Sequence, residues 1–129
     1  MKLLSFILLF ISSSCFALSG DEFDQQYRHL NGELNKAVIN NMIYPRDYDD
    51  KEVPLSEKLE SKSKWCDLTK ARVNLLDFVI QNFSAYKTWV KQNNLDDDSN
   101  LDDFNKFHNN QQKSYIGCQL NLEEYRLKM

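Results

Sequence analysis

Apolar residues along this chain recur mainly at spacings of three and four, which is the period of one face of an α-helix. The first such pattern covers 20–43, with Ser19 and Glu22 placed before it as an S-x-x-E capping box. Pro45 limits it, because the residue before a proline is pushed out of the helical region. We therefore predict a first helix over 20–43. Its apolar face is made by Phe23, Tyr27, Leu30, Leu34 and Ala37.

A second helical pattern begins at Pro54 or Ser56 and continues past Phe83 to Val90. Trp65 widens its apolar face, so this helix is expected to be the most buried one. The residues that carry the period are Leu55, Leu59, Cys66, Thr69, Val73, Leu76 and Ile80.

A third pattern covers 100–128, after a polar turn region that contains a run of aspartates. Ser99 and Asp102 are the expected capping box of this last helix. Its periodic positions are Leu101, Phe104, His108, Gln111, Tyr115, Cys118, Leu122 and Tyr125.

The N-terminus has the composition of a secretory signal peptide: Lys2, an apolar run over 3–11, and small residues that end at Ala17. That run is far shorter than the roughly 20 residues of a membrane span. Cleavage after Ala17 is expected, which makes 1–17 a signal peptide and 18–129 one domain. The alternative is lipid attachment at Cys15; it is less favoured, because Ser12 stands where lipoprotein signals usually have leucine. The mature protein is expected to be secreted or periplasmic.

Two cysteines, Cys66 and Cys118, remain in the mature chain, and in an exported protein they most simply form one disulfide. This bond constrains the helices. If 55–93 were one straight helix antiparallel to 100–128, Cys66 would lie roughly 14 Å along the helix axis from its partner. A disulfide requires Cα atoms within about 7 Å. We therefore predict a helix break near 81–85 and a separate short helix over 84–93.

These patterns together predict an all-α fold, a small bundle of three long helices and one short helix that is stapled by one disulfide. The full chain has 16 Lys and Arg against 19 Asp and Glu. Loss of Lys2 with the signal peptide increases the acidic excess. This balance argues against nucleic acid as a partner, since a nucleic-acid binder would carry a basic stripe. It favours a basic protein partner.

No motif of a known catalytic chemistry is present, and we expect the protein not to be an enzyme. The only histidines are His29 and His108, too few for a zinc set once the mature cysteines are oxidised. The segment 96–107 resembles the start of a calcium loop, but Leu101 and Phe107 replace the required glycine and glutamate. No metal or cofactor is expected.

The loop over 44–54 is the expected partner-binding segment. Tyrosine and arginine are residue types enriched at binding hot spots, and its aspartates would complement a basic cleft. Taken by itself, the loop is more simply explained as an ordinary polar connection, because most loops are polar. The predicted contact residues are Tyr44, Arg46, Asp47, Tyr48, Asp49 and Asp50.

Two segments resemble small exported helical proteins of the bacterial lysozyme-inhibitor type. "QQYRHLNGELNKAV", residues 25–38, is similar to the first helix of that family, and "YIGCQLNLEEYRL", residues 115–127, is similar to its final cysteine helix. The layout also resembles periplasmic immunity proteins that neutralise cell-wall amidases. The resemblance implies binding of a wall-degrading enzyme rather than catalysis.

The leading hypothesis is therefore an exported protein that inhibits or neutralises a lysozyme or amidase by occluding its active site. The alternative is a structural helical module, or one that carries a lipid or another small ligand between its apolar faces.

Overall fold

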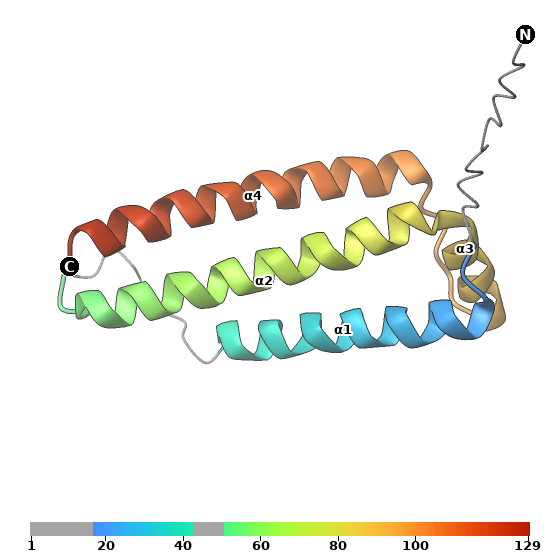
Figure 1. Ribbon diagram of the computed structural model, residues 1–129, viewed down its shortest axis with the longest axis horizontal. Coiled ribbons are helices and arrows are strands. Elements are labelled where there is room, and N and C mark those ends of the chain that lie inside the picture. The colour runs from blue at the N-terminus through green and yellow to red at the C-terminus, as the bar shows by residue number, and fades with distance from the viewer. Residues whose placement is uncertain (1–16, 43–50) are drawn as a thin grey trace, which may run out of the picture.

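The computed structural model describes residues 17–42 and 51–129, and within these ranges it contains four helices and no strand. Three helices are long and one is short, and the predicted all-α fold is confirmed (Figure 1). Their bounds are α1 Gly20–Met42, α2 Leu55–Gln81, α3 Phe83–Gln92 and α4 Leu101–Leu127.

The three long helices lie side by side with α2 in the middle, and α3 lies at one end of the layer (Figure 1). α1 and α4 each pack along α2 but make little contact with each other. Because α2 has a neighbour on both sides, it supplies most of the buried residues, as its apolar pattern predicts. These are Ser61, Cys66, Leu68, Thr69, Val73, Leu76 and Val79.

An aromatic core fills the end of the layer where α3 lies. Phe23 of α1 is only 1% exposed, and its ring stacks on Phe78 with a centroid distance of 5.2 Å. The Tyr27 ring packs 4.6 Å from that of Trp89, and Trp89 Nε1 donates a hydrogen bond of 2.6 Å to Oδ1 of Asp24. This end therefore combines apolar burial with a satisfied indole N–H, which ties α3 to α1.

The predicted helix break is confirmed at Asn82, between α2 and α3. The Asn82 side chain donates a hydrogen bond of 2.9 Å to the carbonyl of Phe78, one turn earlier. Asparagine side chains compete with the backbone for such partners, which favours the end of a helix. The break turns the chain, so that α3 packs on the aromatic core rather than extending α2.

Asn94, with φ of 53°, ends α3 in the left-handed conformation that asparagine adopts more readily than most residues. The N–H of Asn94 bonds to the carbonyl of Lys91 at 3.2 Å, and that of Leu95 to the carbonyl of Val90 at 3.0 Å. This pair of bonds is a Schellman motif, which satisfies the last carbonyls of the helix.

The loop between α3 and α4 is held by two side chains of α3. The hydroxyl of Tyr86, a buried residue, donates a hydrogen bond to Oδ2 of Asp97. Lys87 Nζ donates to the carbonyls of Asp97 and Ser99, at 2.7 and 3.0 Å. The aspartate run is thus held by hydrogen bonds from α3, rather than forming an unattached solvated turn.

The first predicted capping box is confirmed: the Glu22 N–H donates to Ser19 Oγ at 3.2 Å, and the Ser19 N–H donates to Glu22 Oε2 at 2.9 Å. The second is wrong by one residue, since Asn100 and Asp103 form the box at α4. Ser99 is already engaged in the loop, where its N–H donates to Asp97 Oδ1 and its carbonyl accepts from Lys87.

Asp97 should make the stability of this end depend on pH. The hydrogen bond from Tyr86, followed by that from Ser99, holds the pKa of Asp97 below its ordinary value of 3.8. A carboxyl whose pKa is lower in the folded than in the unfolded protein stabilises the fold at pH values above the unfolded pKa. This stabilisation is lost as the pH falls through the pKa of the folded protein. We expect Asp97→Asn to be less stable than wild type at neutral pH, with the difference shrinking below about pH 4.

Urea unfolding of both proteins between about pH 6 and about pH 3 measures this difference. Asp98→Asn is the matched control, because Asp98 is an exposed neighbour in the same run. A difference between wild type and Asp97→Asn that stays constant over the whole range would show that this carboxylate has no special role.

Candidate functional site

The expected contact loop lies between α1 and α2 in the sequence. Its predicted residues Tyr44, Arg46, Asp47, Tyr48, Asp49 and Asp50 lie outside the described residues. The description resumes at Lys51, and Pro54 precedes the first turn of α2. The end of α1, the start of α2 and the C-terminus of α4 lie at the end of the layer opposite the aromatic core (Figure 1), which we call the C-terminal end.

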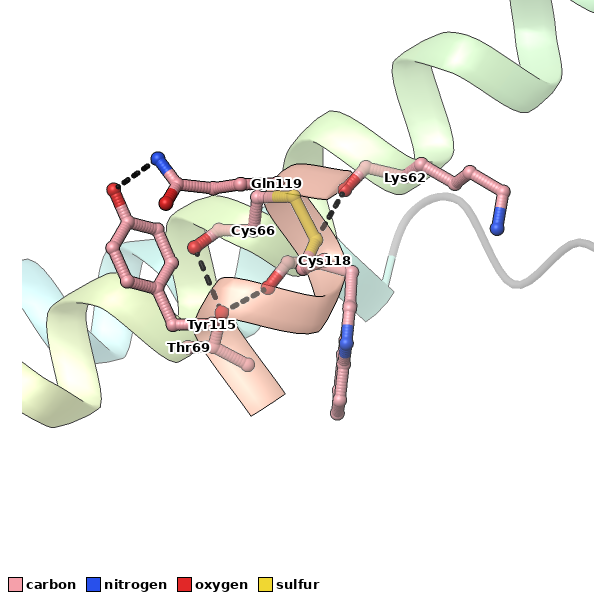
Figure 2. Close-up of a disulfide and its surroundings, with 7 residues drawn as sticks. Lys62, Cys66, Thr69, Tyr115, Cys118 and Gln119 are labelled. Carbon is pink, nitrogen blue, oxygen red and sulfur yellow. Dashed lines mark hydrogen bonds between the residues drawn. A yellow bond between two sulfur atoms is a disulfide. The ribbon is translucent and has the colours of Figure 1, made fainter. Parts of the chain in front are cut away.

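The disulfide predicted between Cys66 of α2 and Cys118 of α4 is confirmed, with Cα atoms 5.5 Å apart. Figure 2 shows the bond between the two helices, beside the carbonyl of Lys62. Cys118 Sγ lies 3.5 Å from that carbonyl oxygen. A disulfide sulfur has no hydrogen to donate, so this is a packing contact. The staple fixes the register of α4 on α2.

Thr69 lies one turn beyond Cys66, and its side chain is completely buried under the staple. Its hydroxyl donates back to the carbonyls of Trp65 and Cys66, at 3.2 and 3.0 Å (Figure 2). On the α4 side, Gln119 Nε2 donates to the hydroxyl of Tyr115 at 2.9 Å. Polar groups close to the disulfide thus find hydrogen-bond partners on their own helix.

Trp65 differs from the sequence expectation of a buried residue, since it is 39% exposed. The centre of the Arg72 guanidinium lies 6.0 Å from the centroid of its ring. Arg72 also reaches α4, where its Nη1 lies 3.5 Å from Oε1 of Gln111. The reason for the exposure is the layered arrangement: α1 and α4 flank α2 without meeting over it. The Trp65 indole therefore lies partly exposed on the surface of α2, with the Arg72 guanidinium near its ring.

A second aromatic side chain with cationic neighbours lies near the C-terminus of α4. The Tyr125 ring has Lys62 Nζ at 4.7 Å from its centroid and Lys128 Nζ at 5.3 Å. Lys128 also donates to Glu124 Oε1 at 2.7 Å, and this hydrogen bond holds the pKa of Glu124 below its ordinary value. Lys62 and Trp65 are one turn apart on α2, so Tyr125 continues the aromatic and basic surface from Trp65 to α4.

Large apolar side chains are also exposed at the C-terminal end. Ile39 and Met42 lie in the last turn of α1, and Leu127 and Met129 lie at the C-terminus of α4. At the other end, the aromatic core buries Phe23 and Tyr86 and partly buries its other rings.

Two polar grooves border the exposed side of α2. One, of about 450 Å³, lies between α1 and α2 and is lined by His29, Lys36 and Lys70 among others. The other, of about 260 Å³, lies beside Cys66 between α2 and α4 and includes Tyr115 and Arg126. Both are open surface grooves whose linings include charged side chains.

The histidines do not come together. His29 lines the groove between α1 and α2. His108 lies between α4 and α2, where its Nε2 is 2.6 Å from Oδ1 of Asp77 but is not aligned for a hydrogen bond. Within 17–42 and 51–129, no group of three His, Cys, Asp or Glu side chains is arranged to hold a metal ion. None of the helices described is both long and apolar enough to cross a membrane.

Comparisons of the chain with protein-family models, with curated proteins and with solved structures gave no match. The resemblance to lysozyme inhibitors therefore rests on residues 25–38 and 115–127 alone. Those segments lie in α1 and in the second half of α4, the two helices that flank α2.

Sequence reasoning missed Trp65 as a surface residue, although one signal was available. Lys58, Lys62, Trp65 and Arg72 recur at spacings of four, three and seven, so they share one face of α2. A tryptophan within a basic face, rather than within the apolar one, indicates partial exposure.

Proposed function

We propose that the mature protein is an exported binding protein that neutralises a cell-wall-degrading enzyme, a lysozyme or an amidase, by covering its active site. The observation that carries the proposal is Trp65, a large aromatic residue that is 39% exposed and has the Arg72 guanidinium 6.0 Å from its ring centroid. Tryptophan and arginine are the residue types most enriched at the centres of protein interfaces.

The surroundings of Trp65 support this function. The disulfide joins α2 to α4 one residue after Trp65, so the helix that carries Trp65 is covalently fixed to a second helix. A site on rigid helices loses little conformational entropy on binding. The loop carries the acidic residues that would complement a basic enzyme cleft, and the whole chain has a formal net charge of −3.

The test is a panel of lysozymes and cell-wall amidases mixed with the purified mature protein. We expect stoichiometric inhibition of cell-wall hydrolysis by at least one of these enzymes, and a stable complex in size-exclusion chromatography. If no enzyme of the panel is bound or inhibited, the proposed function is wrong.

Trp65→Ala should then weaken binding to that enzyme by at least about 30-fold, since hot-spot truncations cost about 2 kcal/mol or more. Leu95→Ala is the matched control, because Leu95 is also an exposed apolar residue but lies at the other end of the molecule. Circular dichroism should show both variants folded at the assay temperature, and isothermal titration calorimetry measures the affinities.

Arg72→Lys separates the role of the guanidinium from its charge. Lysine keeps the positive charge but lacks the planar group that can pack on the indole, so binding should fall below that of wild type. If Trp65→Ala binds and inhibits the enzyme as well as wild type does, Trp65 is not part of the contact site. The inhibitor function would then be correct, but its contact site would lie elsewhere on the protein.

A further inference from the structure

α4 has a second apolar face, which the helix layer leaves uncovered. Ile116, Leu120 and Leu127 are 48%, 69% and 87% exposed. At 100° per residue they lie on the side of the helix opposite Cys118, and Cys118 faces α2 through the disulfide. The structure therefore places three large apolar side chains on the outer edge of the layer, in the direction away from α2.

Charged residues border this outer face in a definite order. Lys113 precedes the apolar residues and Glu123 follows Leu120, each within about 60° of the centre of the face. Lys113, Leu120 and Leu127 are seven residues apart, and Ile116 and Glu123 are also seven apart. This spacing is the heptad repeat by which helices pair along a seam.

We propose that the outer face of α4 binds the same face of a second copy of this chain, with the two helices antiparallel. With the two-fold axis at the level of Cys118, Ile116 of each copy faces Leu120 of the other. In the same register, Lys113 of each copy faces Glu123 of the other. The contact is isologous, so both the apolar pair and the ion pair occur twice.

The order of charges favours this arrangement over its alternatives. A parallel pair would place Lys113 against Lys113 and Glu123 against Glu123, which is repulsive. Glu123 already accepts a hydrogen bond of 2.6 Å from Arg126, but this pair is more than half exposed. A carboxylate can accept from a lysine as well.

The size of the face sets the strength of the dimer. One helix face covers less than a standard protein interface, so the dimer should be weak and depend on concentration. The inference does not rest on the proposed function: Trp65 lies on α2, and its role in binding an enzyme is tested separately.

Sedimentation velocity of the oxidised mature protein, from about 10 µM to about 1 mM, tests the proposal, since this range covers contacts below the standard size. We expect the wild type to shift from monomer to dimer with increasing concentration. Leu120→Glu should raise the dissociation constant at least about tenfold, because it buries two charges at the centre of the contact. Phe107→Glu is the matched control: Phe107 is an exposed apolar residue on another side of α4, and its replacement should leave the dissociation constant unchanged.

Charge exchange tests the register. Lys113→Glu and Glu123→Lys should each weaken the dimer, and the double variant should restore it, because both ion pairs are then remade in reverse. Circular dichroism must show equal helix content for all variants. A wild type that stays monomeric up to about 1 mM overturns the proposal. A dimer that persists in Leu120→Glu also overturns it. So does a double charge-exchange variant that does not recover the wild-type dissociation constant.

Discussion

Replacing Cys66 and Cys118 together by serine is expected to lower the free energy of unfolding by about 4 kcal/mol. The bond closes a loop of 52 residues in sequence, and its loss returns that conformational freedom to the unfolded chain. For a domain of this size the melting temperature should fall by roughly 15–25 °C. Thermal unfolding followed by circular dichroism measures the loss.

The wild-type protein in excess reductant is the matched control, because it keeps both sulfur atoms and loses only the bond. Its melting temperature should agree with that of the double serine variant to within a few degrees. A double variant as stable as the oxidised wild type would mean that packing of α4 on α2 is sufficient without the staple.

Phe23→Ala is expected to have a comparable effect at the opposite end, with a loss of about 3–5 kcal/mol. Phe23 is almost completely buried and stacks on both Tyr27 and Phe78, so its truncation leaves a cavity between α1 and α2. Chemical unfolding in urea gives the free energy difference.

Phe107→Ala is the control for Phe23→Ala, because the exposed Phe107 ring loses far less buried area. Its cost should stay below about 1 kcal/mol. Equal losses for the two variants would contradict the description of an aromatic core that is concentrated around Phe23. If Phe23→Ala does not fold, Phe23→Leu tests the same core with a smaller cavity.

The sequence predicted the helices well because their signals are local. The Ser19 and Glu22 capping box and the three-four spacing after it are contained in a few residues each, and α1 begins where they predict. The break at Asn82 is different: no local signal marked it strongly. It was predicted from the disulfide: in a single straight helix, Cys66 and Cys118 would be too far apart to form the bond.

Two features could not be read from the sequence, for different reasons. The capping box of α4 begins at Asn100 because Lys87, on another helix, engages the Ser99 carbonyl, and this contact depends on tertiary structure. The exposure of Trp65 depends on α1 and α4 lying on either side of α2, and a helical pattern gives only the face on which a residue lies. The predicted contacts of the loop over 44–50 stay a prediction, since they lie outside the described residues.

Two features hold the helices of this protein together. The aromatic core around Phe23 and Tyr86 holds the helices together by burial. The Cys66–Cys118 bond adds a covalent link near the middle of α2, and Trp65 beside it is partly exposed. A covalent staple allows apolar residues to remain at a surface instead of being used in the core.

The intact mass of the protein made in its own cells and alkylated without reductant tests export and oxidation at once. We predict a chain that begins at Leu18 and carries no alkyl group on Cys66 or Cys118. A chain that begins at Met1, or one with both of these thiols alkylated, would contradict it.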